Sequence, residues 1–402
     1  VAQAMDVNLN NCKVVTVAGT NGKGSCVASL NALLLSAGCR VGCFTSPHFL
    51  HYNERIVVNG APASDQAIIE VFERIDQARG DTSLTYFEFG TLAALLIFQH
   101  SDLDVAILEI GLGGRLDAVN IIDADVAVVT SIDVDHEAWL GSDREIIGRE
   151  KAGIFRHGQC AISAGLNPPL SLQQVADECG ATLLQAGVDF SLDVQHHQWH
   201  GVSADGEKVN LENIPLPHLP HESVSAAIQV LQQLGLDISA VDYSCLATLA
   251  LAGRFQSRVV DNKQLILDVA HNPAAAAHLS QRLASEPCAG STYALMAVMA
   301  DKDIVGIVEP LAECFDGWYL PELIDVPRAK SAQSLAQELG RQGYNPLTVC
   351  SSVSQALSAA LSIMSCDDRL IVFGSFFTVA AVLGCSGDSA VVSNRASQAS
   401  YH

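Results

Sequence analysis

The sequence predicts an α/β protein: a P-loop-type doubly wound parallel sheet, as in ATPase domains, followed by a smaller Rossmann-like α/β domain. Two observations carry this prediction. Short runs of continuously apolar residues, typical of strands buried on both faces of a parallel sheet, alternate with helical patterns along most of the chain. Polar loops follow these runs, and ligands bind at the carboxyl ends of strands in such sheets.

The first predicted strand, Val14–Val17, leads directly into a glycine-rich loop over residues 19–25 with the sequence Gly-Thr-Asn-Gly-Lys-Gly-Ser. From Cys26 to Gly38 the apolar spacing is close to 3.6 residues, which predicts a helix that ends at the glycine. A strand, a glycine loop and a helix N-terminus form a phosphate cradle, because backbone N–H groups and the helix dipole attract anionic oxygens.

This loop departs from the strict Walker pattern G-x-x-x-x-G-K-[ST]. Val17 stands at the position of the first glycine, and Gly24 separates Lys23 from Ser25. The alternative interpretation is a glycine turn with an ordinary surface lysine. The phosphate interpretation is favoured, because a Gly-Lys-Gly-Ser sequence directly after a buried strand has little packing rationale.

The other elements of the first domain follow from local patterns. The predicted strands are 41–46, 56–58, 105–110 and 126–132, and the predicted helices are 64–79, 85–98 and 223–234. Polar segments lie at the strand ends, over 19–25, 45–46, 109–117 and 133–136. Because the carboxyl ends of parallel strands meet at one edge, these four segments predict a single site.

A chain of 402 residues predicts two domains. The first covers residues 1–252, with a small β excursion at about 182–212, where short alternating runs replace the strand–helix rhythm. Residues 253–262 are predicted as a linker, 263–385 as the second domain and 386–402 as a Ser-rich tail. The second domain has predicted strands over 265–270, 293–298 and 369–373, and a helix that begins at Asn272-Pro273.

Composition limits the partners. The chain has 44 acidic and 22 basic residues, a formal net charge of -22, which disfavours nucleic acid and anionic membranes. Its longest apolar run, 370–385, is too short and interrupted to span a bilayer. Twelve scattered cysteines indicate reduced thiols in the cytoplasm. We also expect a monomer, and the start at Val1 inside a helix-like pattern indicates a fragment or a missing N-terminal segment.

Four side chains at predicted strand ends indicate a metal–phosphate site: Lys23, Ser46, Glu109 and His136. A hydroxyl and a carboxylate suit Mg²⁺, which prefers oxygen ligands and is often shared with substrate phosphates. Histidine is less typical of Mg²⁺, so the pattern alone leaves the metal open. Separate structural roles for each side chain are the alternative. The histidines at 196, 197 and 200 are predicted to lie in a solvated loop rather than a metal site.

Ordered motifs along nearly the whole chain resemble those of the Mur ligase superfamily. Within it they are most similar to bifunctional bacterial dihydrofolate synthases/folylpolyglutamate synthases. The glycine loop resembles the nucleotide loop of this family. The other motifs lie at 45–48, 53–55, 84–88, 108–118, 131–132, 135–136, 148–154, 253–255, 268–273 and 374–376.

The resemblance implies an ATP-dependent ligase with a Mur-ligase-like ATP-binding domain and a C-terminal glutamate ligase domain. ATP would phosphorylate a pterin-linked carboxylate, and the amino group of L-glutamate would attack the acyl phosphate to form an amide. The implied acceptors are dihydropteroate and reduced folates, and the implied cofactors are ATP and Mg²⁺. Lys23, the loop amides and magnesium would meet the charge on the transferring phosphoryl group.

The resemblance also implies roles for individual residues. Catalytic roles fall to Lys23, His136 and Lys151, and metal ligation to Ser46, Glu109, His136 and, if carbamylated, Lys151. ATP contacts fall to Thr20, Asn21, Gly22, Lys23, Gly24, Ser25, Ser223, Arg254, Asp268, His271 and Asn272. Substrate contacts fall to Thr85, Tyr86, Phe87, Glu88, Leu116, Asp117 and Ala118. From the residues alone, Lys151 is predicted to be an ordinary lysine on a helix surface. Tyr86 and Phe87 could equally be aromatic residues of the core.

The chain departs from the family pattern in three places. A family segment that carries pterin-site residues is absent before Val1. Ser223 stands where the family usually has an asparagine that contacts ATP, and Phe377 stands in place of a histidine. The alternatives are therefore a folylpolyglutamate synthase without dihydrofolate synthase activity and a nucleotide-binding, non-catalytic homologue. A peptidoglycan-precursor ligase is disfavoured by the segment 84–88.

Overall fold

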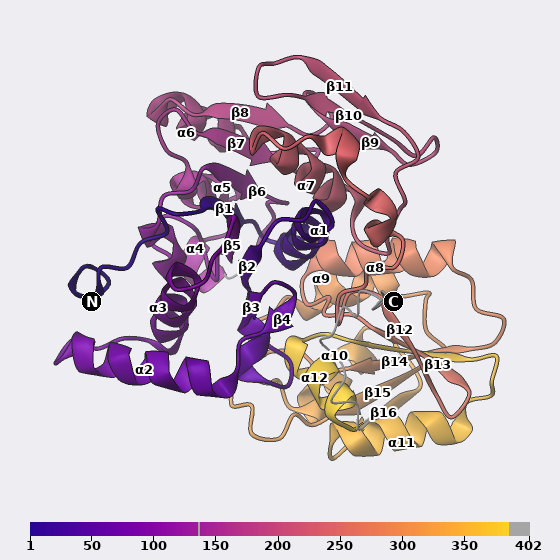
Figure 1. Cartoon of the computed structure of the whole chain (residues 1–402). Helices are drawn as coiled ribbons and strands as arrows, with labels where there is room; N and C mark the ends of the chain where they lie inside the picture. Colours follow the sequence, from indigo (N-terminus) through magenta and orange to yellow (C-terminus); the bar gives the residue numbers. More distant parts are fainter. Residues whose placement is uncertain (136, 386–402) are drawn as a thin grey trace, which may run out of the picture. The chain divides into compact units, whose positions relative to one another are not determined.

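The structure is a computed structural model that describes residues 1–135 and 137–385 (Figure 1). The described chain divides into two compact units, one over Val1–Leu249 and one that begins at Ala250. Each unit has its own sheet. Within the described residues, no helix combines the length and the apolar character that a membrane crossing requires.

An eight-stranded sheet forms the centre of the first unit, in the order β4-β3-β2-β5-β1-β6-β7-β8. The strands are β1 (Lys13–Ala18), β2 (Val41–Phe44), β3 (Ile56–Val58), β4 (Ala61–Pro62), β5 (Val105–Glu109), β6 (Val126–Val129), β7 (Cys160–Ser163) and β8 (Thr182–Gln185). Strands from β2 to β8 along this order pair in parallel, which confirms the predicted parallel sheet. Only β3 and β4 are antiparallel, as a hairpin at one edge.

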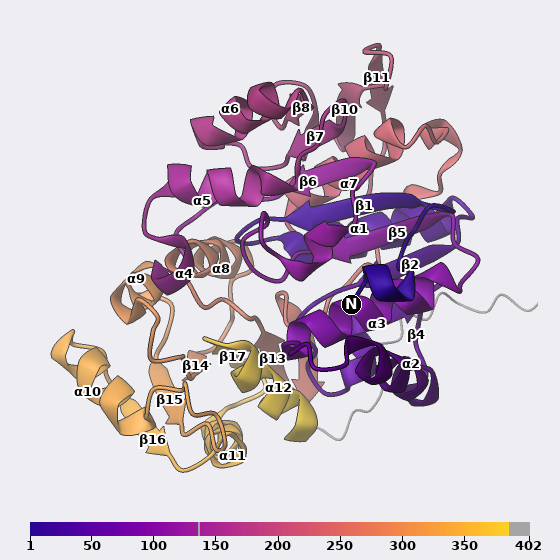
Figure 2. The same ribbon diagram turned by 90° about the vertical axis from the view of Figure 1, so that its left-hand side faces the viewer.

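Helices cover both faces of this sheet (Figures 1 and 2). Their bounds are α1 (Lys23–Ser36), α2 (Asp65–Arg79), α3 (Tyr86–Gln99), α4 (Glu137–Leu140), α5 (Arg144–Lys151), α6 (Leu170–Cys179) and α7 (His221–Gln233), with short 3-10 helices η1 (Gln3–Met5), η2 (Tyr52–Arg55), η3 (Ala118–Ile121), η4 (Ala152–Ile154), η5 (Ile238–Ala240) and η6 (Tyr243–Leu246). Helices α1 and α7 pack against each other. Helices α2, α3, α5 and α6 contribute to a hydrophobic core that also contains alternate side chains of the strands.

The predicted elements of this unit are present, with shifted ends. Helix α1 begins at Lys23 and not at Cys26, because Gly22 adopts φ 88° and turns the chain into the helix three residues earlier. Strands β2, β5 and β6 end earlier than predicted, because their last predicted residues leave the sheet to form loops, whereas β3 ends as predicted and β1 extends to Ala18. Ser64, the first residue of the predicted helix 64–79, caps α2, with its hydroxyl accepting from Ala67 N at 3.2 Å.

The predicted β excursion is smaller than 182–212. Thr182–Gln185 is β8 of the large sheet, since its residues pair in parallel with β7. The separate sheet contains β9 (Ser191–Asp193), β10 (Gln198–Val202) and β11 (Lys208–Leu211). Trp199 on β10 is fully buried and its indole N–H donates to Ser225 O of α7 at 3.1 Å, so this sheet is anchored on α7.

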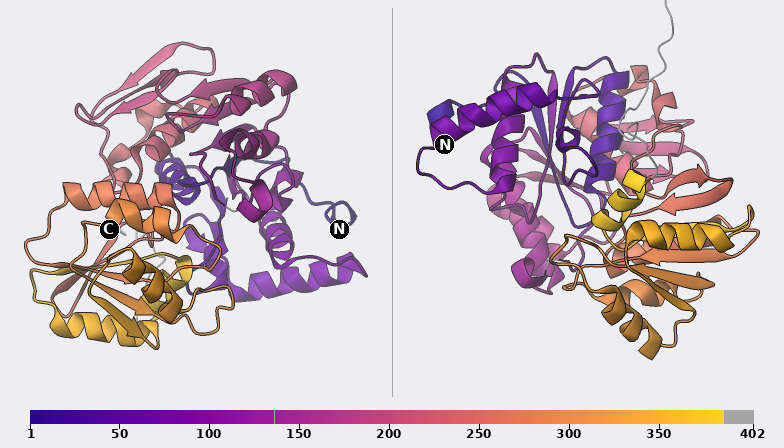
Figure 3. Two further views of the ribbon diagram at one scale, coloured as in Figure 1. Left: turned by 180° about the vertical axis from the view of Figure 1, so that it is seen from behind. Right: turned by 90° about the horizontal axis from the view of Figure 1, so that it is seen from below.

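The second unit has a six-stranded sheet in the order β12-β13-β17-β14-β15-β16 (orange to yellow in Figure 3). Its strands are β12 (Gln256–Val260), β13 (Lys263–Leu267), β14 (Thr292–Met296), β15 (Gly317–Pro321), β16 (Leu347–Cys350) and β17 (Arg369–Phe373). Its helices are α8 (Pro273–Ser285), α9 (Ile304–Val308), η7 (Glu309–Leu311), α10 (Ala332–Arg341), α11 (Val353–Ile363) and α12 (Phe376–Cys385). Strands β13 to β16 along this order pair in parallel, as the Rossmann-like prediction requires.

The predicted linker 253–262 is not a linker over its whole length. Gln256–Val260 forms β12, which pairs antiparallel with β13 across a two-residue turn. Asp261 and Asn262 in this turn have φ 50° and 59°, the left-handed values of a type I′ hairpin. Asp and Asn tolerate this conformation, so the local sequence supports a hairpin.

Candidate active site

The glycine loop after β1 is bound to the end of the neighbouring strand β6. Thr20 N donates to Ser131 O at 2.7 Å, and Thr130 Oγ1 donates to Asn21 O at 2.7 Å. At Gly19, with φ 142°, a Cβ would lie 1.8 Å from Thr130 Oγ1. This position therefore requires glycine. The backbone of the predicted phosphate loop is held in one shape by the strand beside it.

Two serine hydroxyls, one on α7 and one on α1, lie at this loop. Ser223 of α7 contacts the loop from a distant part of the sequence, with its Oγ donating to Gly22 O at 3.3 Å. Ser25 Oγ in the first turn of α1 is buried and has no hydrogen-bond partner within the described residues. A buried hydroxyl and the free N–H groups of a helix N-terminus are the donors that a phosphate group uses.

Two lysines point at the same backbone oxygen of this loop. Lys23 Nζ lies 3.0 Å from Gly19 O and 3.3 Å from Thr20 O. Lys151 Nζ, at the end of α5, also lies 3.0 Å from Gly19 O. Burial and, second, the charge of Lys23 lower the pKa of Lys151 from 10.5 to about 7. An anion between the two amines would relieve their repulsion.

Ser46 and Glu109 meet at the carboxyl ends of β2 and β5. Glu109 is 4% exposed, and its Oε2 accepts a hydrogen bond from Ser46 N at 3.0 Å. The third predicted ligand, His136, lies outside the described residues. Among those described, no group of three His, Cys, Asp or Glu side chains could hold a metal. A buried carboxylate beside a serine fits the oxygen donors that Mg²⁺ prefers, as part of a ligand set.

The loop from Gly111 to Asp117 is closed by a carboxylate. Asp117 Oδ2 accepts from the N–H groups of Gly111 and Leu112 at 3.1 and 2.9 Å, and its Oδ1 accepts from Val119 N at 2.9 Å. Burial raises the pKa of Asp117, while these backbone donors and Lys23 oppose the rise. Asp117 is thus engaged in holding the loop, whereas Leu116 beside it is 78% exposed.

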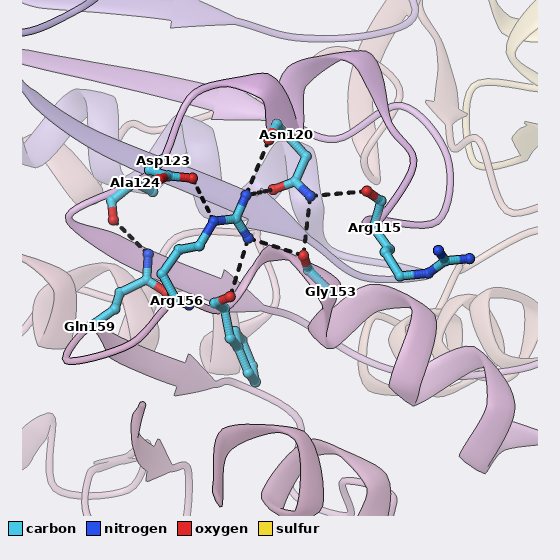
Figure 4. A network of polar contacts seen from close by, with 8 residues as sticks. Arg115, Asn120, Asp123, Ala124, Gly153, Arg156 and Gln159 are labelled. Carbon is cyan, nitrogen blue, oxygen red and sulfur yellow. Dashed lines mark hydrogen bonds and ion pairs between the residues drawn. The ribbon is translucent and has the colours of Figure 1, made fainter. Parts of the chain in front are cut away.

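A hydrogen-bond network centred on Arg156 joins this loop to the segment after Lys151 (Figure 4). The Arg156 guanidinium donates to Asp123, to Asn120 and to the carbonyls of Gly153 and Phe155. Asn120 Nδ2 donates to Arg115 O and Gly153 O, both at 3.1 Å. The network fixes the segment carrying Leu116–Ala118 relative to the end of α5.

The predicted substrate residues at the start of α3 divide into two kinds. Thr85 and Glu88 form a capping box, in which Thr85 Oγ1 accepts from Glu88 N and Glu88 Oε2 accepts from Thr85 N. Phe87 packs on Gly111, where a Cβ would lie 2.6 Å from its ring. Tyr86 is 61% exposed, so its ring is accessible to a ligand.

The predicted ATP residues of the second unit form their own group. Asp268 is half-buried. Loss of solvation raises its pKa against the opposing charge of Arg254, and it accepts from Phe255 N and Ala270 N, both at 2.8 Å. The Arg254 guanidinium lies 5.2 Å from the ring centre of Phe376. His271 Nδ1 contacts Val269 O at 2.7 Å, and Asn272 caps α8.

The sequence prediction missed residues that support the site through contacts distant in sequence. Thr130 holds the glycine loop, and Asp133 O accepts from Thr20 Oγ1 at 3.0 Å. A hydroxyl at the end of a predicted apolar strand was the available signal for Thr130. Arg156 and Asn120 carried no such signal, because most of their partners are backbone carbonyls that the fold brings near.

A glycine loop with two converging lysines at the carboxyl edge of a parallel sheet, followed by a second α/β unit, defines a nucleotide-binding ligase of the Mur type. The sequence profile described as "Mur ligase, glutamate ligase domain" matches residues 253–376. The dihydrofolate synthase/folylpolyglutamate synthase of Escherichia coli is 45% identical over 372 residues, which cover 92% of this chain and 86% of that protein.

Solved structures agree with this likeness. That of E. coli FolC in complex with DHPP and ADP has 43% identity and a TM-score of 0.88, covering 96% of this chain and 91% of that one. A bifunctional folylpolyglutamate synthase/dihydrofolate synthase with Mn, AMPPNP and L-glutamate bound has 42% identity and a TM-score of 0.88, covering 96% and 92%. This chain belongs to the dihydrofolate synthase/folylpolyglutamate synthase family.

Proposed function

We propose that this protein joins L-glutamate to dihydropteroate, giving dihydrofolate, and to reduced folates, in reactions driven by ATP with Mg²⁺. The observation that carries the proposal is the convergence of Lys23 and Lys151 on Gly19 O, beside the carboxylate of Glu109. The Lys23 cation at a glycine loop suits the oxygens of a transferring phosphoryl group. The neighbouring carboxylate, together with Lys151 in its anionic carbamylated form, suits a divalent ion that accompanies the phosphate.

The chemistry proceeds in two steps. A carboxylate oxygen of the acceptor attacks the γ-phosphorus of ATP, the bond from that phosphorus to the β-bridging oxygen breaks, and ADP leaves. The amino nitrogen of glutamate then attacks the carbonyl carbon of the acyl phosphate. The C–O bond to phosphate breaks, the nitrogen loses a proton, and an amide and inorganic phosphate result. Phosphorylation is needed because a carboxylate is itself a poor acyl donor.

The residues of the first unit would share this work. The loop residues Thr20 to Ser25, with Ser223, would bind the phosphates through backbone N–H groups and hydroxyls, and Lys23 would add a positive charge. Ser46, Glu109, His136 and a carbamylated Lys151 would hold magnesium, which stabilises charge on the phosphate oxygens when bound. Carbamylation requires an unprotonated amine, and a pKa of about 7 makes Lys151 a suitable target. A mass increment of one carbamate on Lys151 in native conditions tests this assignment; its absence contradicts it.

The remaining assignments concern the acceptor and the nucleotide. We propose that Tyr86, Phe87 and the segment Leu116–Ala118 contact the acceptor, with Thr85 and Glu88 positioning the start of α3. Arg254, Asp268, His271 and Asn272 are proposed to contact ATP from the second unit. A cytoplasmic location and a monomeric state remain predictions, supported for the location by twelve cysteines that form no disulfide.

The test is phosphate release by the purified protein with Mg-ATP, L-glutamate and either dihydropteroate or tetrahydrofolate. Release above the acceptor-free control with both acceptors supports the bifunctional enzyme. Release with tetrahydrofolate alone indicates a folylpolyglutamate synthase only. Binding of ATP without release in any mixture would identify a non-catalytic homologue and contradict the proposal.

A further inference from the structure

Arg55 lies at the carboxyl edge of the sheet in the first unit. It is the last residue of η2 and directly precedes β3. Its carbonyl oxygen accepts a hydrogen bond from Thr45 N at 2.9 Å, and the next residue, Ser46, donates to Glu109. Arg55 therefore lies on the same edge as the residues proposed to hold metal and phosphate.

Aromatic side chains enclose the Arg55 guanidinium. Arg55 is 8% exposed, and its Cζ lies 5.6 Å from the ring centre of Tyr52 and 5.3 Å from that of Tyr86. The two rings are nearly perpendicular, with an interplanar angle of 86° and centroids 5.6 Å apart. Since Tyr86 is 61% exposed, a ligand in contact with its ring has access from solvent.

The charge of Arg55 has no carboxylate partner among the described residues. Its Nε–H donates to His48 Nδ1 at 2.8 Å, and no Asp or Glu oxygen of the described chain lies within 4.0 Å of its nitrogens. The neighbouring Glu54 is engaged elsewhere, because its oxygens accept from the N–H groups of Phe49, Leu50 and His51. Among the residues that the structure describes, four of the five N–H donors of the guanidinium thus have no protein acceptor.

Two other arginines that are buried or lie beside a ring have the hydrogen-bond or carboxylate partners that Arg55 lacks. Arg369 is similarly buried, at 7% exposed, but donates to Thr292 Oγ1 and to two backbone carbonyls. Arg79 also lies beside a ring, with Cζ 5.9 Å from the centre of Phe89, and is paired with Asp76. A charge that is largely buried and lacks such partners keeps its free donors available for a ligand or for the little water that reaches them.

We propose that Arg55 binds the α-carboxylate of a glutamyl residue already attached to the acceptor, an inference that rests on the proposed function. A guanidinium matches a carboxylate through two parallel N–H···O bonds. The aromatic walls formed by Tyr52 and Tyr86 keep water from competing for these donors. Arg55 is thereby a specificity residue for reduced folates that carry glutamate, and dihydropteroate lacks the group it recognises.

A non-reacting carboxylate is the better ligand for chemical reasons. Arginine bound to the reacting carboxylate would withdraw electron density from the oxygen that attacks phosphorus, and it would stabilise the ground state more than the transition state. The α-carboxylate takes no part in bond making, so its binding adds affinity without this penalty. The α-carboxylate and the reacting carboxylate of a glutamylated acceptor would then be bound by different groups of the protein.

The experiment compares Arg55→Met and Arg55→Lys with the wild type, using dihydropteroate and monoglutamyl tetrahydrofolate as acceptors. We expect Arg55→Met to raise KM for the glutamylated acceptor about 10-fold or more, and to change KM for dihydropteroate less than about 2-fold. Arg55→Lys should lie between, because the charge is kept and the paired geometry is lost. Arg79→Met is the matched control, and it should change neither KM.

A ligand-side measurement keeps the test independent of folding. The wild type should bind the α-carboxamide of monoglutamyl tetrahydrofolate more weakly than the acid, by a similar factor, whereas Arg55→Met should not distinguish the two. Equal losses with both acceptors, unchanged KM values, or equal binding of acid and amide by the wild type would each overturn the proposal. An inactive wild type would contradict the proposed function instead, and acceptor binding would still test Arg55.

Discussion

Lys23 and Lys151 come from helices far apart in the sequence, and each places its amine 3.0 Å from the carbonyl oxygen of Gly19. Lys23 also lies 3.3 Å from Thr20 O, whereas Lys151 is buried beside the charge of Lys23. The pKa of Lys151 is lowered to about 7, chiefly by burial and next by Lys23, so the protein keeps this amine largely neutral above neutral pH. This arrangement prepares the loop for an anion and Lys151 for chemical modification.

The lowered pKa of Lys151 predicts a pH dependence of stability. Between about pH 7 and 10.5 the amine is protonated in the unfolded chain and neutral in the folded one. The unfolded chain therefore binds more protons, and the free energy of unfolding rises with pH in this window through this group. Lys151→Met should remove the rise. Urea unfolding at pH 7 and pH 9 in CO₂-free buffer measures it, and identical pH slopes for the two proteins would contradict the expectation.

Lys23→Ala should reduce turnover by about 100-fold or more, because it removes a charge that faces the transferring phosphoryl group. Phosphate release with saturating Mg-ATP, acceptor and glutamate is the measurement. Lys13→Ala is a suitable control, since Lys13 begins the same segment at the other end of β1 and is paired with exposed Asp125. Turnover of Lys23→Ala close to that of the control would refute the assigned role.

Glu109→Gln should weaken divalent-metal binding about 10-fold or more, since it removes a buried anionic ligand while keeping the shape of the side chain. Titration with Mn²⁺ in the presence of a non-hydrolysable ATP analogue, followed by electron paramagnetic resonance, reports the affinity directly. Glu178→Gln alters an exposed carboxylate paired with Arg149 and should leave the affinity unchanged. Equal affinities of the two variants would exclude Glu109 as a ligand.

Arg156→Met should destabilise the first unit by about 1–2 kcal/mol, because several carbonyl groups in the network of Figure 4 lose their donor. Denaturant unfolding measures this loss. Arg149→Met removes an arginine whose pair with Glu178 lies on the surface, and little change is expected there. If both variants unfold at the same denaturant concentration, the network does not support the fold as described.

Local sequence was sufficient for most elements. Apolar runs marked the strands, Ser64 marked the start of α2, and Gly19 to Ser25 marked the loop. Two local predictions were wrong in extent. The β excursion was misjudged because β8 pairs with β7, and no local signal identifies that partner. The linker was misjudged although the partner strand is adjacent in sequence. Strand β12 pairs with β13 across the Asp261-Asn262 turn, a local hairpin signal that the prediction did not use.

The sequence by itself determined the order of elements, the glycine loop and the family, since these depend on residue type and spacing along the chain. The tertiary structure alone decided that Lys151 shares a carbonyl with Lys23. It also decided that Arg55 is buried beside two tyrosines, with no carboxylate partner in the described part of the chain. Burial and charge pairing depend on which distant segments the sheet brings together. For that reason the phosphate loop was predictable from its motif, and the electrostatics around it were not.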